Sequence, residues 1–158
     1  MNFKMREANN SDYTELFKLA AEVYKLHLKN RPDVYLNIGS PMPKEYFDEL
    51  LSSDNSKVFV AQNIDNKELA AYSVMQIMTT KNPMYIQKKF VFIDDYCVKS
   101  NYKRNGIGRL LFNYIKEYAK TADAASLQLN VWEFNKDAIK FYEAMGMSTR
   151  NRRMELNL

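Results

Sequence analysis

A strand-like apolar run, a pair of glycines and an amphipathic helix follow one another between residues 90 and 118. The run from Phe90 to Val98 is rich in β-branched and aromatic residues, which is typical of a buried strand. Beyond Gly106 the apolar spacing becomes helical. The helical stripe consists of Ile107, Leu110, Leu111, Tyr114, Ile115 and Tyr118. Gly106 and Gly108 stand at the junction, where glycine allows the backbone to approach a ligand closely.

The first turn of this helix is predicted to bind an anion. Its free N–H groups and its dipole favour negative charge, and successive amides in such a turn can cradle a pyrophosphate. Lys103, Arg104 and Arg109 add positive charge. The segment is not a P-loop, because no Gly-Lys-Ser/Thr follows, and it lacks the third glycine of a dinucleotide-binding fingerprint. Taken alone, two glycines before a helix are equally typical of a tight turn.

Length and composition favour one domain, residues 1–158, with a small phosphate-bearing ligand. A single cysteine, Cys97, excludes an internal disulfide and a cysteine-rich zinc site, and we expect no metal. No signal sequence and no membrane-spanning run are visible, so we expect a cytoplasmic protein without a membrane partner. The net charge is +4, but basic and acidic residues alternate along the chain, so we expect no nucleic-acid partner.

The remaining segments predict a mixed α/β sheet with helices on its faces. Strands are expected at residues 2–8, 58–64, 69–78, 90–98 and 127–131, with a closing strand along the last stretch to Leu158. Helices are expected after the N-cap candidates Ser11 and Asp12, after Pro43, after Gly106, and from Asn135 to Met145. Gly146 is well placed as the residue that ends the last helix.

Two motifs in this order resemble the GCN5-related N-acetyltransferase (GNAT) superfamily. The family pattern is a strand, an Arg/Gln-x-x-Gly-x-Gly/Ala loop and helix, another strand, and Asn-x-x-Ala-x-x-Phe-Tyr-x-x-x-Gly-Phe. The chain matches it from Phe90 to Met147, with Lys103 in place of Arg or Gln and Met147 in place of the last aromatic residue. The resemblance implies the GNAT-like acyl-CoA N-acyltransferase fold: a mixed, mostly antiparallel sheet of about six to seven strands flanked by about four helices.

The resemblance also implies acetyl-CoA as co-substrate. Its pantetheine arm would pair like an extra strand beside Tyr96, Cys97 and Val98. Its pyrophosphate would lie on the loop that consists of Lys103, Arg104, Asn105, Gly106, Ile107, Gly108 and Arg109. Asn135 would contact the cofactor arm through its side-chain amide. The same residue suits the N-cap of its helix, and both roles can hold at once.

The implied chemistry is direct transfer of the acetyl group to a primary amine. Tyr142 matches the tyrosine that protonates the departing thiolate; the alternative is a core aromatic beside Phe141. Asp95 is the expected base, because partial burial and repulsion from Asp94 would raise one pKa of this pair. The alternative is that one carboxylate faces solvent at a strand bulge while the other bonds the backbone. Cys97 is expected to be inert packing rather than a nucleophile.

The acceptor pocket is expected at the end of the first helix and beyond the strand at 127–131, where this family varies. The candidate residues are His27, Arg31, Trp132 and Glu133. The guanidinium of Arg31 could clamp an acceptor carboxylate, or it could simply pair with Asp33. The sequence does not name the amine, and a homodimer stays open as the oligomeric state.

Two other functions compete with a metabolite acetyltransferase. One is a catalytically silent acyl-CoA-binding module, against which the presence of Tyr142 and Asn135 argues. The other is an acyltransferase that modifies a protein or uses a longer acyl chain. The sequence does not separate these, because acceptor and acyl specificity belong to loops carried on a shared fold.

Overall fold

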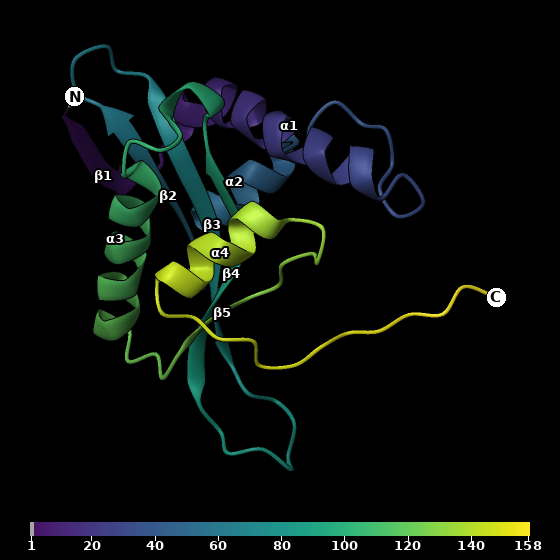
Figure 1. Ribbon diagram of the computed structural model, residues 1–158. Coiled ribbons are helices and arrows are strands. Elements are labelled where there is room, and N and C mark those ends of the chain that lie inside the picture. The colour runs from purple at the N-terminus through teal and green to yellow at the C-terminus, as the bar shows by residue number, and fades with distance from the viewer. Residues whose placement is uncertain (1) are drawn as a thin grey trace.

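The computed structural model describes residues 2–158, which fold around one five-stranded sheet (Figure 1). Its strands are β1 (Phe3–Glu7), β2 (Ser56–Asn63), β3 (Leu69–Thr79), β4 (Lys89–Val98) and β5 (Leu127–Leu129). Its α-helices are α1 (Tyr13–Asn30), α2 (Lys44–Ser52), α3 (Ile107–Thr121) and α4 (Lys136–Ala144). Short 3-10 helices, η1 (Asn10–Asp12) and η2 (Ser100–Tyr102), precede α1 and α3. The α/β class is as predicted.

The strands follow the order β1-β2-β3-β4-β5 across the sheet. Pairing is antiparallel from β1 to β4, and β5 runs parallel to β4. The sheet is therefore mixed and mostly antiparallel, which confirms the prediction. The expected number of six to seven strands was wrong, because residues 2–158 contribute five.

The closing strand is the clearest error. Residues 148–158 contain no strand and run away from the sheet to the C-terminus (Figure 1). Met154, Leu156 and Leu158 alternate as strand residues do, but their side chains are almost fully exposed. Alternation of apolar and polar residues shows only that a segment could fit a sheet. A strand forms only where the edge of a neighbouring strand is available to hydrogen-bond with it. Instead of pairing with the sheet, this segment forms an ion pair: Glu155 lies 2.7 Å from the guanidinium of Arg31.

The start of α1 agrees with the prediction in part. Asp12 occupies the N-cap position of α1, as expected, but its side chain makes no cap hydrogen bond to that helix. The side-chain cap belongs to the preceding 3-10 turn η1, where Asn9 Oδ1 accepts from the Ser11 N–H at 2.9 Å. Asp12 Oδ2 accepts in return from the Asn9 N–H at 2.8 Å, which completes a capping box. Both carboxylate oxygens of Asp12 also bind the guanidinium of Arg6 at 2.8 Å. The sequence did not predict this 3-10 turn, whose capping box begins at Asn9, three residues before the N-cap of α1.

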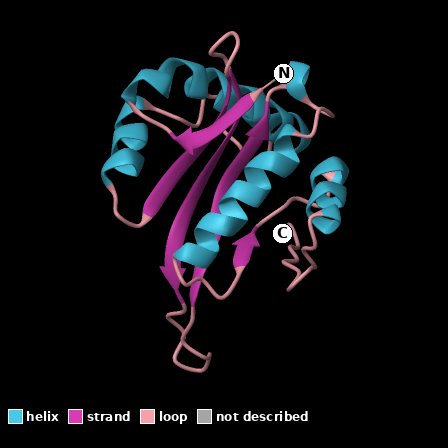
Figure 2. Cartoon of the chain, turned by 90° about the vertical axis from the view of Figure 1, so that its left-hand side faces the viewer, coloured by secondary structure: helices cyan, strands magenta, loops and turns pink. Residues whose placement is uncertain are grey.

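The helices pack on opposite faces of the sheet (Figure 2). The apolar stripe of α3, together with α4, covers one face. That core includes Phe59, Met75, Val91, Ile93, Ile107, Leu111, Phe112 and Ile115. The other face is covered by α1 and α2. That core includes Leu16, Leu19, Phe47, Leu50, Val58, Val60, Tyr72 and Val74. Since successive strand residues point to opposite faces, neighbouring residues of β4 serve different cores.

The end of α4 is set by Gly146, as predicted. Gly146 has a left-handed φ of 90°, and its N–H donates to the Glu143 carbonyl at 2.9 Å. The Met147 N–H donates to the Tyr142 carbonyl at 3.0 Å. This pair of hydrogen bonds is a Schellman motif, which satisfies the last carbonyls of the helix. It fixes where α4 stops and holds Tyr142 in its last turn.

Candidate functional site

β4 and β5 pair over three residues and then separate. Val91, Phe92 and Ile93 pair with residues 127–129. From Asp94 to Val98, β4 pairs with β3 alone, so its outer edge has no strand partner within residues 2–158. β5 ends two residues earlier than expected, because the chain turns at Trp132, whose carbonyl accepts from the Asn135 N–H at 2.9 Å. The free edge is the one that the resemblance assigns to the cofactor arm.

The N-terminus of α3 presents free backbone donors. Gly106 caps the helix with a left-handed φ of 79° and without a side-chain hydrogen bond, and Arg104 is also left-handed, with a φ of 63°. Within residues 2–158 no group accepts from the N–H groups of Ile107, Gly108 and Arg109. The side chain of Ile107 is buried in the core, so that residue offers its backbone alone. The turn is therefore built as an anion-binding helix N-terminus.

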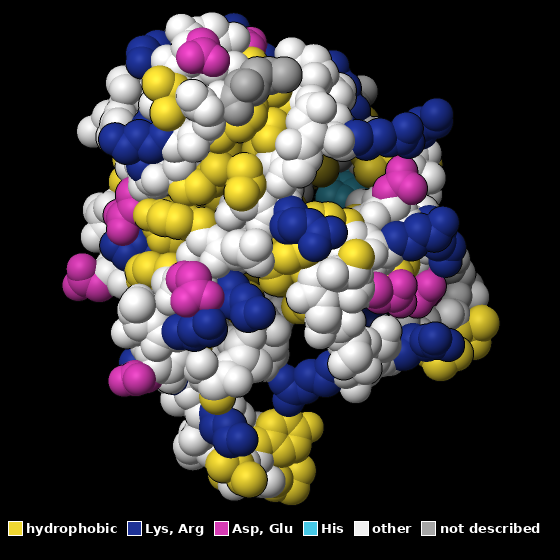
Figure 3. Space-filling model, turned by 60° about the vertical axis from the view of Figure 1, so that its left-hand side comes forward, with side chains coloured by type: hydrophobic (Ala, Val, Ile, Leu, Met, Phe, Trp, Pro, Cys, Tyr) yellow, Lys and Arg dark blue, Asp and Glu magenta, His cyan; other side chains and the backbone are white. Residues whose placement is uncertain are grey.

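The basic side chains of this loop are exposed. Lys103, Arg104 and Arg109 form no ion pair with any carboxylate of the described chain. The first turn of α3 contains no acidic residue either. On the face that carries α3, Lys and Arg side chains stand around a hollow (Figure 3). Positive charge and free amide donors thus coincide at the start of α3.

Tyr96 connects the free edge of β4 to this loop. Its hydroxyl donates to the Gly108 carbonyl in the first turn of α3. A Cβ on Gly108 would lie 3.4 Å from side-chain atoms of Val98 and Phe141, so the helix start packs closely against β4 and α4. The Tyr96 side chain faces the core with Phe112 and Phe141. Its contribution to a ligand at the edge is therefore limited to the main chain.

Cys97 faces the opposite core. The residue is 6% exposed, and its Sγ lies 3.7 Å from the Leu19 carbonyl oxygen. Burial, helped by the nearby charge of Asp95, raises the pKa of the thiol to about 12. A thiol that stays protonated at neutral pH is a poor nucleophile. The geometry is that of inert packing.

Asp95 is held by two hydrogen bonds. The buried Tyr72 hydroxyl donates to its Oδ2, and the Tyr96 N–H donates to its Oδ1 at 2.9 Å. Burial raises the pKa of Asp95 to about 6, although both hydrogen bonds favour the charged form. Repulsion from Asp94 adds only a minor upward shift of this pKa, so desolvation is the main cause.

Asp94 lies on a β-bulge. Val74 pairs with Asp95 and Met75 pairs with Ile93, so Asp94 is the extra residue in β4. Asp94 is exposed at its surface, but the protein atoms around its carboxyl group remove part of its hydration, and this raises its pKa. A hydrogen bond from Gln76 partly opposes this rise in the pKa. Asp94 is thus the carboxylate that faces solvent at the bulge, and Asp95 is the one that bonds the backbone. This arrangement is the alternative to a catalytic base that the sequence left open. Asp95 combines that backbone bond with a raised pKa.

Tyr142 lies on α4 against the aromatic side chains near the free edge. Its ring centroid is 6.2 Å from that of Tyr96 and 6.5 Å from that of Phe112. Within the described residues its hydroxyl has no hydrogen-bond partner. Burial raises its pKa well above the usual range, and the nearby Asp95 raises it further. The hydroxyl is therefore a neutral proton donor at physiological pH.

Asn135 caps α4. Its Oδ1 accepts from the Ala138 N–H at 3.3 Å, as the N-cap interpretation predicts. The side-chain NH₂ group donates to no partner within residues 2–158. Capping occupies the oxygen alone, so the nitrogen of the same amide can serve a ligand.

Three of the four predicted acceptor-side residues meet in one aromatic cluster. His27 stacks on Tyr35 with ring centroids 5.3 Å apart, and Trp132 Nε1 donates to the Tyr35 hydroxyl at 2.7 Å. Phe134 stacks on Trp132 at 5.9 Å. The guanidinium of Arg31 lies 4.7 Å from the centre of the Trp132 ring. Burial lowers the pKa of His27, so its imidazole is neutral at pH 7.

The guanidinium of Arg31 is already engaged. Its Nε and Nη2 donate to the two oxygens of Asp33 at 2.9 and 2.7 Å, and Nη2 also meets Glu155 at 2.7 Å. The fourth predicted residue, Glu133, lies outside the cluster, because its exposed carboxylate pairs with Lys136 at 3.4 Å. The ion pair with Asp33 was foreseen, whereas the one with Glu155 depends on the course of the C-terminal segment.

Several neighbours of the candidate site carry no distinct sequence signal. Tyr72 is one apolar residue among many in β3, and nothing in the sequence marks it as the partner of Asp95. Tyr35 and Phe134 are single aromatics in irregular segments, 99 residues apart by number. Only the fold brings such residues together.

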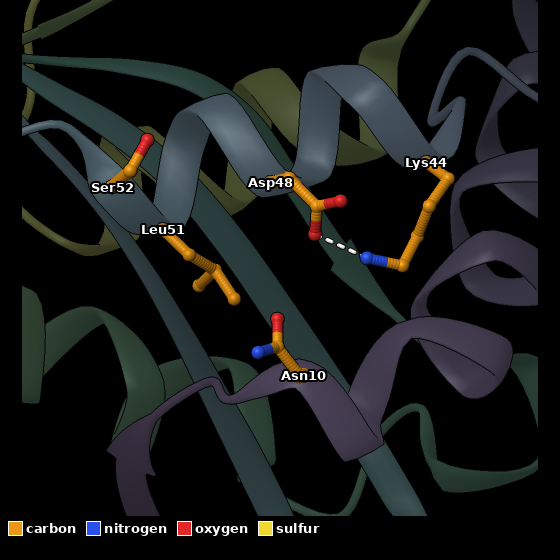
Figure 4. Close-up of a pocket in the computed structure, with 5 residues that line it drawn as sticks. All are labelled: Asn10, Lys44, Asp48, Leu51 and Ser52. Atoms are coloured by element: carbon orange, nitrogen blue, oxygen red, sulfur yellow. Dashed lines mark hydrogen bonds and ion pairs between the residues drawn. The ribbon is translucent and has the colours of Figure 1, made fainter.

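A hollow of about 430 Å³ lies elsewhere, between α2 and η1 (Figure 4). Lys44 and Asp48 pair along its rim, one helical turn apart, and Asn10, Leu51 and Ser52 complete the lining. This hollow contains none of the predicted site residues. Among residues 2–158, no three His, Cys, Asp or Glu side chains gather closely enough to hold a metal ion. No helix in this range is long and apolar enough to cross a membrane.

Comparison with known proteins gives concordant results. Residues 16–147 match the acetyltransferase (GNAT) family. A solved tetramutant of the BH1408 protein from Bacillus halodurans is 33% identical, with a TM-score of 0.94 over 98% of this chain and 99% of that one. An L-ornithine N5-acetyltransferase from Arabidopsis thaliana is 31% identical over 64 residues, which are 40% of this chain and 28% of that protein.

A more distant solved structure has the same fold. An aminoglycoside N-acetyltransferase in complex with CoA is 13% identical, with a TM-score of 0.76 over 99% of this chain and 95% of that one. The family match spans most of the chain, from α1 to the residue after Gly146, and includes the anion-binding turn, the free edge of β4 and α4. The chain therefore belongs to the GNAT family of acetyltransferases.

Proposed function

We propose that this chain, as a single domain of residues 1–158, transfers the acetyl group of acetyl-CoA to a primary amine by direct attack on the thioester. The carrying observation is an arrangement along β4. The anion-binding start of α3 packs against Val98, the unpaired edge follows, and two carboxylates, Asp94 and Asp95, lie just past the last residue of β4 that pairs with β5. A diphosphate, an amide-bearing arm and a reacting amine could take these three places in the same order.

The residues present fit acetyl-CoA. The N–H groups of Ile107, Gly108 and Arg109, with the cations of Lys103 and Arg104, suit a diphosphate. The main-chain edge from Tyr96 through Cys97 to Val98 and the free amide nitrogen of Asn135 suit the arm's own amides. Bound acetyl-CoA would supply the thioester carbonyl that the amine attacks.

Two residues are proposed to move the protons. An ammonium must lose a proton before its nitrogen can attack, and Asp95, with a pKa of about 6, is a carboxylate at pH 7 that can accept it directly or through water. A C–N bond then forms and the C–S bond breaks. The Tyr142 hydroxyl gives a proton to the departing sulfur and regains one from the new amide nitrogen through solvent. The net products are an amide, a thiol and one proton.

The choice of an amine as acceptor draws on one relative and on one cluster of side chains. The plant relative is named for acetylating L-ornithine at N5, which is an amine nitrogen, and this supports an amine acceptor. The cluster of His27, Arg31 and Trp132, with Tyr35 and Phe134, is proposed to border the acceptor side, as the resemblance implies. We do not include Glu133, because its exposed carboxylate pairs with Lys136.

The test is a transfer assay. The purified chain is mixed with acetyl-CoA and, in turn, with amines, polyamines, amino acids or peptides. Release of the free thiol is measured with a colorimetric thiol reagent, and the acetylated product is identified by mass spectrometry. We expect thiol release that depends on an amine and falls strongly in Tyr142→Phe. Binding of acetyl-CoA without transfer to any acceptor would favour a silent acyl-CoA-binding module. Failure to bind acetyl-CoA would overturn the proposal.

A further inference from the structure

A second hollow, of about 370 Å³, lies on the sheet face shared with α1 and α2. Its lining comes from three strands and no helix. The lining residues are Gln76 and Met78 of β3, Phe90, Phe92 and Asp94 of β4, and Gln128 of β5. Phe92 and Gln128 are paired in the sheet one position before the last pair, Ile93 with Leu129. The hollow therefore runs up to the point where the two strands separate.

The β-bulge turns both carboxylates of β4 to this face. Tyr72 and Gln76 are four residues apart on β3, so their side chains point the same way. Asp95 accepts from the Tyr72 hydroxyl, while Asp94 lines the hollow beside Gln76. Without the extra residue, consecutive strand positions would point to opposite faces. A group seated on Asp94 therefore lies next to the carboxylate proposed as base.

The chemistry of the lining is simple. Asp94 is its sole charged residue, and it forms no ion pair within residues 2–158. Met78, Phe90 and Phe92 provide an apolar floor, and Gln76 and Gln128 are neutral amides. No Lys or Arg is present to receive an anion. The hollow thus combines one negative charge with apolar walls, which suits an ammonium on an apolar body.

The aromatic cluster offers no such free charge. The Nε and Nη2 donors of Arg31 are bound by Asp33 and Glu155, and Trp132 Nε1 is bound by Tyr35. Two carboxylates thus already offset the single positive charge of Arg31. Asp94, in contrast, has no cationic partner within residues 2–158.

We propose that the acceptor is a primary amine on an uncharged apolar arm, which binds in this hollow with its ammonium on Asp94 and its arm against Phe90 and Phe92. This inference rests on the proposed function and names its substrate class. Asp94 is a binding residue that holds the ammonium beside Asp95, which takes the proton. A carboxylate next to the amine would be repelled by Asp94 and would find no cation in the lining.

The test compares two amines that differ by one group. Phenethylamine and phenylalanine share the aromatic arm, and phenylalanine adds a carboxylate beside the amine; hexylamine and L-ornithine extend the comparison to aliphatic arms. With acetyl-CoA in excess, we expect kcat/KM for phenethylamine to exceed that for phenylalanine by at least about tenfold, which corresponds to about 1.4 kcal/mol. Hexylamine should exceed L-ornithine in the same way.

Variants locate the effect in the hollow. Asp94→Asn should raise the KM for phenethylamine at least about tenfold, and Phe92→Ala about fivefold or more, with the KM for acetyl-CoA unchanged. Asp123→Asn is the matched control, because Asp123 is an exposed carboxylate outside the hollow whose left-handed φ of 57° suits asparagine. It should change neither KM, and melting curves should confirm that each variant folds.

The outcomes separate the two proposals. If amines are acetylated but L-ornithine or phenylalanine is preferred, or if Asp94→Asn leaves the KM for phenethylamine unchanged, the hollow is not the acceptor site and the proposed function stands. Acetyl-CoA binding without acetylation of phenethylamine or hexylamine also overturns the substrate class. If acetyl-CoA itself does not bind, the proposed function fails first.

Discussion

The hydroxyl of Tyr72 donates a hydrogen bond to Asp95 across the β3–β4 pair. Tyr72 is fully buried, so the carboxylate meets its partner away from bulk water. The hydrogen bond favours the charged carboxylate and burial disfavours it, and burial prevails because the pKa of Asp95 rises from 3.8 to about 6. That net shift corresponds to about 3 kcal/mol against the charged form. Asp95 is thereby brought into the range where a base works near neutral pH.

The pH dependence of Tyr72→Phe tests this balance. In the unmodified chain kcat/KM should fall as the pH drops through about 6, because protonated Asp95 cannot accept a proton. Removing the Tyr72 hydroxyl removes an interaction that favours the charged form, so the acid limb of the profile should move to higher pH. Profiles are measured with one acceptor for both proteins, so the titration of the amine cancels. If the acid limb of the kcat/KM profile lies at the same pH in Tyr72→Phe as in the unmodified chain, Asp95 does not control the rate.

Tyr142→Phe should lower kcat with little change in affinity for acetyl-CoA. The hydroxyl acts on charge that forms as the thiolate leaves, and general acids commonly contribute about 10²–10⁴-fold. Tyr85→Phe is a matched control, because Tyr85 is 56% exposed in the β3–β4 loop. Full turnover in Tyr142→Phe would leave Tyr142 as an aromatic packing residue beside Tyr96.

Gly108→Val should weaken acetyl-CoA binding by at least about tenfold. A first side-chain atom at this position would lie 3.4 Å from both Val98 and Phe141, so the further methyls of valine must push the start of α3 away from β4. The control is Gly39→Val, since nothing lies within 4 Å of a Cβ there. Isothermal titration gives the affinities, and melting curves give the cost in stability. Unchanged affinity would remove the loop from the binding site.

Cys97→Ala should keep transfer activity within about twofold. The buried thiol has a pKa of about 12, so it is not expected to carry the acetyl group. Alkylating reagents should modify Cys97 in the native protein far more slowly than in the unfolded chain. An acetyl group trapped on Cys97 and detected by mass would contradict direct transfer.

Arg31→Ala should affect acceptors with and without a carboxylate equally. Its donors bind Asp33 and Glu155, and it lies over Trp132, so its loss should loosen the cluster and lower the melting temperature. Arg31→Lys should lower the melting temperature less than Arg31→Ala does, since lysine keeps the charge but cannot reproduce the bidentate contact with Asp33. A rise in KM confined to carboxylate-bearing acceptors would restore the clamp expected from the sequence.

The segments that could be predicted from the sequence are those whose structure depends on residues close to one another along the chain. The Gly106 turn, the stripe of α3 and the stop at Gly146 each depend on residues a few positions apart. The closing strand could not be judged in this way, because alternation at Met154, Leu156 and Leu158 says nothing about a free edge. The 3-10 turn before α1 was missed for a related reason, because Asn9 and Asp12 form its capping box only where the chain takes that turn.

The candidate site shows the same limit. The sequence indicated Asp94 and Asp95 because acidic residues interrupt an apolar run, but the bulge that turns both to one face depends on the register with β3. Tyr72 and Tyr35 matter through partners 23 and 97 residues away. Contacts at such separations are set by topology, which short-range patterns do not encode.

Arg104 and Gly106, both left-handed, have a consequence for the entropy of binding. Holding a non-glycine residue such as Arg104 in this conformation costs about 1–2 kcal/mol, and folding bears that cost whether or not a ligand is present. The hydroxyl of Tyr96 fastens the next turn through the Gly108 carbonyl. A ligand with phosphate groups would therefore meet amide donors that are already aimed, and little chain freedom would be left for binding to remove.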